Sequence, residues 1–198
     1  MKLYISDTSP YARMARIVVH EKGLGARVEE VQARTREAHS PYYEVNPSGR
    51  IPYLITDEGQ GIEGSALVCR YLDELDGAPA FDWQGDWEAR RLEEQARSLL
   101  DGLGVWVREL RRPEDERSPT ILAHEAARAD RLTAHWEAQA GHALLQGPLD
   151  MVQITLVCAL EMDLRLDGFQ WRERCPELAR WLARITDRPS IAATRPPH

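Results

Sequence analysis

A serine followed by a proline at the start of a predicted helix is the first residue pair that could do chemistry. Ser9 is a good N-cap, and Pro10 suits the first helical position, where its missing N–H costs nothing. A helix N-terminus favours negative charge, so a hydroxyl placed there could donate a hydrogen bond to an anionic ligand atom. Alone, however, a Ser-Pro pair is more often a plain helix cap.

Two further segments could contribute to the same site. Residues 46–54, Asn-Pro-Ser-Gly-Arg-Ile-Pro-Tyr-Leu, form a turn followed by a strand whose second residue, Pro52, belongs at a strand start because it lacks a ladder donor. Ser65 is expected to cap a later helix, whose N-terminal N–H groups suit a carboxylate. Each segment alone is weak evidence. Together they predict a ligand site, because their order along the chain would bring them to one end of a sheet.

The elements that must position these residues fall into two groups. The N-terminal half is predicted to be strand–helix–strand followed by strand–strand–helix, with the first two strands parallel. Its strands are expected at 2–5, 26–31, 51–56 and 62–63, its helices begin at Pro10 and Ser65, and 34–49 is a loop with at most a short helix. The helix after Ser65 is expected to bury Leu67, Val68, Tyr71, Leu72 and Leu75.

The C-terminal half shows no convincing strand and is predicted to be an antiparallel helical bundle. Helices are expected at 87–110, from Ser118-Pro119 to about 140, at 154–166 and at 176–186, followed by a Pro-rich tail. Asp150 with Gln153 three residues later is a capping-box variant that introduces the most apolar helix. The predicted division is a domain at 1–76, a linker at 77–86 and an all-α domain at 87–198.

Composition excludes several classes of protein. The net charge of −7 and the scattered Lys and Arg argue against nucleic-acid binding. No apolar run approaches the roughly 20 residues that span a bilayer, and no signal peptide is evident, so we expect neither a membrane span nor export. The three cysteines, Cys69, Cys158 and Cys175, are widely spaced and suit a reducing compartment. Neither they nor the six histidines form a metal motif, so we expect no metal.

The order of elements and four segments resemble the glutathione transferase family, in particular bacterial members of the serine type. The segments are Ser9-Pro10-Tyr11-Ala12, the Asn-Pro-x-Gly-x-Val-Pro-x-Leu-like stretch at 46–54 (whose second proline is cis in the family), Ser65-Ala66-Leu67 with Tyr71-Leu72, and 188–194. The resemblance covers nearly the whole chain and is strongest over 1–75. It implies an α/β thioredoxin-like N-terminal domain with a four-stranded mixed sheet, joined to the all-α bundle.

The resemblance also implies an activity and a set of site residues. It implies a cytoplasmic homodimeric enzyme that takes glutathione as co-substrate and directs its thiolate at a hydrophobic electrophile. Ser9 would stabilise the thiolate, with Thr8, Arg13 or backbone amides as alternatives. Glutathione would contact Arg50, Ile51, Pro52, Glu63, Ser65 and His39, and the electrophile pocket would include Tyr11, Trp106 and Arg108.

One position departs from the family pattern, and it keeps other interpretations open. The residue before the family's serine is normally Glu, Gln or Asp, whereas this chain has Gly64. Glu63 could take that role or be a solvated acid at a strand end. Gly64 is also the best support for the alternative of a non-catalytic binding or regulatory protein. A small redox protein is disfavoured because no cysteine lies near residues 8–12. For Trp106, a place in the core of the helical bundle is as good an interpretation as a place in the electrophile pocket.

Overall fold

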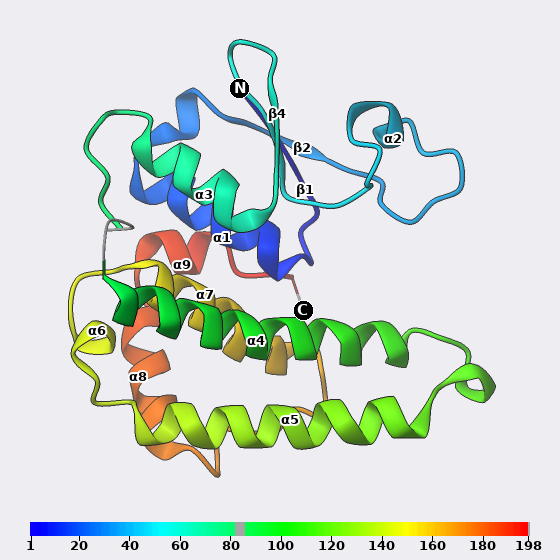
Figure 1. The fold of residues 1–198 in the computed structure, drawn as a ribbon, viewed down its shortest axis with the longest axis vertical. Helices are drawn as coiled ribbons and strands as arrows, with labels where there is room; N and C mark the ends of the chain where they lie inside the picture. The colour runs from blue at the N-terminus through cyan, green and yellow to red at the C-terminus, as the bar shows by residue number, and fades with distance from the viewer. Residues whose placement is uncertain (82–85, 198) are drawn as a thin grey trace. The chain divides into compact units, whose positions relative to one another are not determined.

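The computed structural model describes residues 1–81 and 86–197 (Figure 1). The chain divides into two compact units: an N-terminal unit of residues 1–82 and 188–197, and a helical unit of residues 83–187. The sequence-based division differs from this one, because it assigns the last segment to the helical domain. Residues 82–85 of the predicted linker lie outside the described residues.

A four-stranded mixed sheet forms the centre of the N-terminal unit. Its strands are β1 (Lys2–Ile5), β2 (Glu29–Gln32), β3 (Tyr53–Ile55) and β4 (Gly61–Glu63), in the order β2-β1-β3-β4. β1 pairs in parallel with β2 and antiparallel with β3, and β3 pairs antiparallel with β4. The predicted thioredoxin-like strand order and the parallel first pair are therefore confirmed.

Helices α1 (Pro10–Glu21) and α3 (Ser65–Glu74) lie together on one side of this sheet (Figure 1). The fully buried strand residues Leu3, Ile5 and Leu54 alternate with more exposed neighbours, as expected for a sheet covered on one face. On α3 the buried residues are Ser65, Val68, Cys69, Leu72 and Asp73. The prediction that Leu67 belongs to the buried face is wrong, because its side chain lies on the opposite side of the helix and is exposed.

Two element boundaries in this unit differ from the predictions. A short 3-10 helix, η1 (Leu24–Ala26), follows Gly23, so β2 begins at Glu29 rather than at 26. β3 begins at Tyr53 because Pro52 has no N–H to donate to a ladder. The segment predicted as a loop contains one short helix, α2 (Tyr42–Val45).

The helical unit is built around a buried helix. Its elements are α4 (Trp87–Leu110), η2 (Glu114–Glu116), α5 (Pro119–Ala138), α6 (Ala143–Gln146), α7 (Met151–Leu160), η3 (Glu161–Leu164) and α8 (Pro176–Thr186). Every residue of α7 is buried, which confirms the predicted central helix, although it starts three residues earlier than expected and gives way to η3 after Leu160. In the described part of the chain, no helix combines the length and apolar character needed to cross a membrane.

The predicted caps of this unit are only partly right. The Ser118 hydroxyl accepts a hydrogen bond from the Ile121 N–H, as expected of an N-cap. Asp150 Oδ1 likewise accepts from the Gln153 N–H at 2.9 Å. Among the described residues the reciprocal bond, from the Asp150 N–H to the Gln153 side-chain oxygen, is not formed, and the Gln153 Nε2 donates to the Leu144 and Pro148 carbonyls, each at 2.7 Å.

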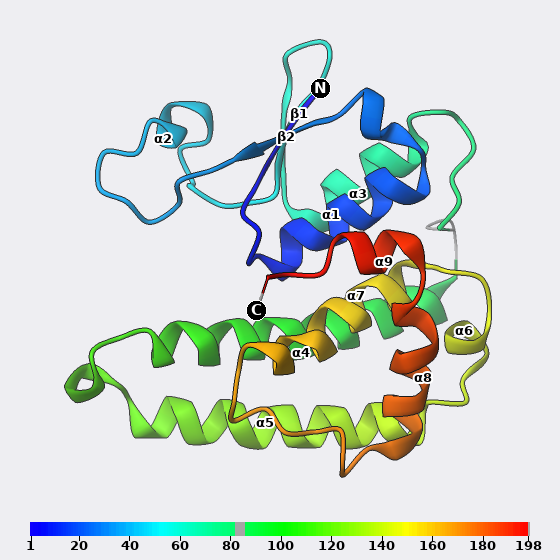
Figure 2. The same ribbon diagram turned by 180° about the vertical axis from the view of Figure 1, so that it is seen from behind.

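The C-terminal segment is a helix rather than the predicted Pro-rich tail. Helix α9 (Pro189–Ala193) lies beside α1 in the N-terminal unit (Figure 2). The Arg13 side chain, 4% exposed, donates to the Ile191 carbonyl at 3.1 Å and to Thr194 Oγ1 at 3.4 Å. At the other end of α1, Glu21 pairs with Arg188 at 2.6 Å. Polar contacts at both ends of α1 therefore attach the C-terminal segment to the N-terminal unit.

Candidate functional site

Strand register places the three predicted segments at one edge of the sheet. Tyr4 of β1 pairs with Tyr53 of β3, and Tyr53 pairs with Glu63 of β4. The end of β1, the start of β3 and the end of β4 therefore lie at the same edge. The loop to Ser9 leaves β1 there, Pro52 directly precedes β3, and Ser65 directly follows β4 and Gly64.

Ser9 forms the N-cap of α1 in a way that leaves its proton available. Its side-chain oxygen accepts a hydrogen bond from the Ala12 N–H at 3.2 Å, and Pro10 occupies the first helical position. A serine hydroxyl has one hydrogen to donate and two acceptor lone pairs. Because the cap uses a lone pair, the O–H can still donate to an anion at the helix start. Ser9 and Tyr11, which follows it in the first turn, are both half-buried.

The Ile51–Pro52 peptide bond is cis, as the resemblance implies. Pro52 is buried and Ile51 is half-buried at the sheet edge. Arg50 is exposed, and its backbone carbonyl accepts two side-chain hydrogen bonds, from Tyr42 and Asn46. His39 is exposed in the loop before α2 and has a positive φ of 62°.

The start of α3 differs from the prediction that Ser65 is its N-cap. Gly64 holds the N-cap position without a side-chain hydrogen bond, and Ser65 is the first helical residue, 8% exposed. Gly64 has φ 94° and ψ 126°, a backbone conformation that residues other than glycine rarely adopt. A Cβ added at Gly64 would meet nothing within 4 Å, so the position has room for a side chain at the cost of backbone strain.

Glu63 lies on the sheet face that α1 and α3 do not cover. Its neighbour Ile62 pairs with the buried Leu54, and alternation along β4 therefore turns Glu63 to the same face as its partner Tyr53. Glu63 is exposed. Burial raises the pKa of Tyr42 to about 12, and the nearby charge of Glu63 adds to the rise. Glu63 is thus near enough to Tyr42 for its charge to affect that pKa.

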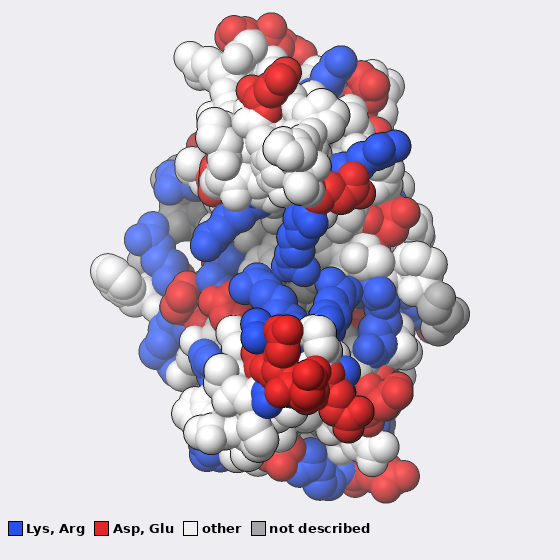
Figure 3. Space-filling model, turned by 90° about the vertical axis from the view of Figure 1, so that its right-hand side faces the viewer, with Lys and Arg blue, Asp and Glu red and all other residues white. Residues whose placement is uncertain are grey.

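Two predicted site residues lie in the helical unit. Trp106, 8% exposed, packs against Gly168, where an added Cβ would lie 2.9 Å from its ring. Arg108 is exposed near the end of α4. Figure 3 looks at the tip where α4 ends and α5 begins, and basic side chains surround a group of acidic ones there. Arg112 forms ion pairs in this region with Glu109 and Glu116.

Comparison with known proteins places the chain in a family. The family model for the glutathione S-transferase N-terminal domain matches residues 8–75. The crystal structure of a glutathione transferase family member from Pseudomonas fluorescens Pf-5, with bound glutathione, is 30% identical with a TM-score of 0.90 and covers 100% of this chain and 99% of that one. This chain belongs to the glutathione transferase family. The family fold predicted from the sequence is therefore confirmed.

Other relatives extend over the same length. An uncharacterized GST-like protein of Escherichia coli K12, YibF, is 28% identical over 202 residues, which cover 100% of this chain and 99% of the relative. A glutathione S-transferase from Methylobacillus flagellatus KT, solved with glutathione bound, is 27% identical with a TM-score of 0.87 and covers 99% of both chains. The similarity to the glutathione transferase family thus includes the helical unit.

Tyr42 contacts the segment before Pro52, and the sequence pattern does not indicate this contact. The sequence predicts only a turn at Asn46 and no role for the tyrosine four residues before it. The turn from Asn46 to Gly49 returns the chain so that the Arg50 carbonyl meets both side chains, a contact that no helical spacing indicates.

Proposed function

We propose that this protein is a glutathione transferase that binds glutathione at the edge of its sheet, stabilises the thiolate and directs it at an electrophile. The observation that carries the proposal is the convergence of Ser9, the Ile51–Pro52 segment and the start of α3 at one sheet edge. The relatives solved with bound glutathione support it.

Ser9 is assigned the role of hydrogen-bond donor to the glutathione sulfur. A free thiol has a pKa near 8.5, so only a small fraction is thiolate at neutral pH. A hydrogen bond to a charged acceptor contributes about 1.5–3 kcal/mol and a helix N-terminus about 0.3–1 kcal/mol. Because one pKa unit corresponds to about 1.4 kcal/mol, these two effects are large enough to lower the thiol pKa by one to two units. Ser9 need not lose its own proton.

Main-chain groups are assigned most of the remaining glutathione contacts. The backbone of Ile51, beside Pro52, would pair with the cysteinyl part of the tripeptide as an added strand does. The N–H groups at the start of α3, with Ser65, would hold the γ-glutamyl carboxylate. Arg50 and His39, both exposed, are the candidates for the glycyl carboxylate. Glu63 is the candidate for the amino group unless that group is left to solvent beside Gly64.

Tyr11 of the N-terminal unit and Trp106 and Arg108 of the helical unit are the side chains proposed to contact the second substrate. The thiolate would form a carbon–sulfur bond while the leaving group departs with its electron pair; addition–elimination and peroxide reduction with the glutathione thiol are open to the same site. Position 9 is serine, so a route through the enzyme's own mixed disulfide is not part of the proposal. A homodimer and a cytoplasmic location, implied by the family resemblance, complete it.

Replacing Ser9 by Ala tests the proposal directly. We expect glutathione to bind with nearly unchanged affinity, while the pKa of its bound thiol rises by about one unit because the sulfur loses a charge-assisted hydrogen bond. Ultraviolet thiolate absorbance against pH, with calorimetric titration of glutathione, measures both quantities. Ser118→Ala is the matched control, since it also removes an N-cap serine but one that caps α5.

The outcomes of this experiment separate the candidate roles. An unchanged thiol pKa in Ser9→Ala would transfer the role to backbone amides, Thr8 or Arg13. Negligible glutathione binding by the wild type, or a bound tripeptide without thiolate absorbance, would instead favour the alternative function, a non-catalytic binding or regulatory protein. Gly64 is the observation that favours that alternative, since no side chain at that position can hold the ligand's amino group.

Gly64→Glu tests whether the missing side chain weakens binding. The variant has room for the new carboxylate, and we expect glutathione to bind about 2- to 5-fold more tightly through one solvent-exposed ion pair. The positive φ should lower the free energy of unfolding by about 1–3 kcal/mol. Gly59→Glu is the control, because Gly59 also has a positive φ and open space but lies in the β3–β4 turn. Unchanged affinity in Gly64→Glu, together with weaker binding by Glu63→Gln, would assign the amino group to Glu63.

A further inference from the structure

The backbone carbonyl of Arg50 is held by two side chains at once. The Tyr42 hydroxyl donates to it at 2.6 Å and the Asn46 amide at 3.0 Å. A carbonyl oxygen has two lone pairs, so both of its acceptor sites are used. Arg50 directly precedes Ile51, the residue assigned to the cysteinyl part of glutathione.

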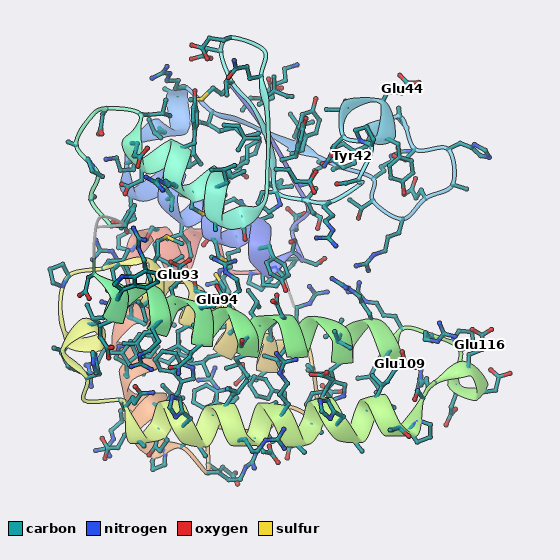
Figure 4. The ribbon with its side chains drawn as sticks, viewed as in Figure 1. Tyr42, Glu44, Glu93, Glu94, Glu109 and Glu116 are labelled. Carbon is teal, nitrogen blue, oxygen red and sulfur yellow. The ribbon has the colours of Figure 1, made fainter. Side chains whose placement is uncertain are left out.

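Both donors are fixed by their surroundings. Tyr42 is 4% exposed, and its ring lies 5.3 Å from the ring of Tyr4 on β1. Asn46 is 2% exposed, and its side-chain oxygen accepts a hydrogen bond from the Ser48 N–H at 3.2 Å, which orients the amide. In Figure 4 the Tyr42 side chain lies between α2 and the strands, whereas Glu44 of the same helix points away from them.

The Tyr42 donor also persists across the pH range in which a thiol ionises. Burial raises the pKa of Tyr42 to about 12, against the opposing effect of its hydrogen bond with Asn46. The phenol therefore keeps its proton at neutral and moderately alkaline pH. The contact with the Arg50 carbonyl does not weaken as the bound thiol titrates.

Fixing one carbonyl fixes the N–H of the next residue. A trans peptide unit is planar, and its N–H points away from its C=O. The Arg50–Ile51 bond is not cis, so the direction of the Ile51 N–H follows from that of the Arg50 carbonyl. Tyr42 and Asn46 hold the carbonyl side of this peptide plane. The opposite side, with the Ile51 N–H, is left for whatever lies at the sheet edge.

We propose that Tyr42 and Asn46 are positioning residues that orient the Arg50–Ile51 peptide for main-chain pairing with the cysteinyl part of glutathione. They act through Arg50 and do not touch the tripeptide. The inference rests on the proposed function and extends it to two residues that hold the glutathione-binding peptide in place. Glutathione affinity would then depend partly on a buried phenol that contacts the Arg50 carbonyl and not the tripeptide.

The experiment compares Tyr42→Phe with wild type, using glutathione as the probe. Losing one neutral hydrogen bond to the carbonyl should weaken glutathione binding about 3- to 10-fold, measured by calorimetry. The pKa of the bound thiol should stay as in wild type, because Ser9 lies on a different segment. Hydrogen exchange of the Ile51 N–H in the free protein should become faster in Tyr42→Phe. General destabilisation would instead accelerate exchange throughout the N-terminal unit.

Two tyrosines serve as matched controls. Tyr4→Phe keeps the ring that packs on Tyr42, and Tyr43→Phe removes a hydroxyl one residue further along α2, where the ring lies against Gly49. Both are expected to bind glutathione as wild type does. Asn46→Ala removes the second donor, and the double variant should weaken binding more than the two single effects predict, because either donor alone can still hold the carbonyl.

Each outcome decides the question. Wild-type affinity in Tyr42→Phe, or equal weakening in Tyr43→Phe, overturns the positioning role while leaving the proposed function intact. Absence of glutathione binding by the wild type overturns the proposed function itself. If Tyr42→Phe fails to fold, Asn46→Ala alone carries the test: weaker binding with an unchanged thiol pKa supports the role, and unchanged binding refutes it.

Discussion

A chain that ends at Asp187 is expected to lose the native structure of its N-terminal unit while its helical unit remains folded. Truncation removes α9, whose Ile191 carbonyl and Thr194 hydroxyl accept from the Arg13 guanidinium. A buried charge that loses partners typically costs about 3–5 kcal/mol. That is a large part of the roughly 5–15 kcal/mol that stabilises a domain.

Other contacts are lost with α9. Ile191 is fully buried, and Glu21 loses Arg188 and Ser190. The hydrogen bond from Arg188 holds the pKa of Glu21 below its usual range, against the effect of burial. A lowered carboxyl pKa stabilises the folded state above the unfolded-state pKa, and this stabilisation is lost as pH falls through the folded-state pKa. Truncation should therefore also remove this contribution at neutral pH.

The helical unit has its own optical probe. All six tryptophans lie between residues 83 and 181, so tryptophan fluorescence reports that unit, whereas amide exchange of β1 and β3 reports the N-terminal unit. A chain truncated after Thr194 is the control, because it keeps α9 and should behave as wild type. Protected β1 amides in the chain ending at Asp187 would contradict the prediction.

A second substitution identifies the cause of the expected loss. Arg13→Met removes the buried charge while keeping an apolar side chain of similar length, and in the full-length chain it leaves the Ile191 carbonyl without that donor. In the truncated chain the same change should restore part of the lost stability, since the charge that has lost its Ile191 and Thr194 acceptors is then absent. Absence of any rescue would mean that lost apolar burial, rather than Arg13, causes the damage.

The sequence predicted most of the fold, because its signals are local. Helices 87–110 and 176–186 have the predicted bounds, since their apolar spacing and caps depend only on neighbouring residues. The structure also contains the predicted four-stranded mixed sheet. The packing of α9 onto α1 was missed because it depends on contacts across more than 160 residues, which no local pattern encodes.

The local structure around the candidate site residues was predicted only in part. Ser9 caps α1 as its residue type indicates. Ser65 was misassigned because the start of α3 is set by the positive φ of Gly64, which capping preference does not reveal. Tyr42 was missed because its role depends on a carbonyl eight residues away, brought close by the turn at Asn46.

Asp150→Asn is expected to stabilise the helical unit at neutral pH. Burial raises the pKa of Asp150 to about 6, against the effect of its backbone hydrogen bonds at the start of α7. The charge of Glu93 on α4, labelled in Figure 4, adds to the rise. Burial also raises the pKa of Glu93 itself, although Arg97 lies 2.7 Å from it. Two carboxyl groups that resist ionisation thus lie close together in this unit.

The sign of the effect follows from proton linkage. A carboxyl group whose folded-state pKa is raised contributes stability that is complete below its unfolded-state pKa and is lost as pH rises through its folded-state pKa. Asp150 should therefore cost stability above about pH 6, by about 2 kcal/mol once its partial exposure is allowed for. Asparagine keeps a cap acceptor without the charge.

A rule based on helix caps alone predicts the opposite result. Losing a negative charge at a helix N-terminus normally costs about 0.3–1 kcal/mol. Asp86→Asn should show this behaviour, because Asp86 caps α4 through the Glu88 N–H at 2.8 Å but is exposed.

Urea unfolding followed by tryptophan fluorescence, from about pH 4 to 8, compares the two variants across the range in which Asp150 titrates. We expect Asp150→Asn to match wild type at the acid end, where the protonated acid and the amide are both neutral, and to exceed it above about pH 6, where only the wild-type side chain carries the charge that burial disfavours. A loss of stability at neutral pH in both variants would show that the helix dipole, rather than burial beside Glu93, decides the energy of this cap.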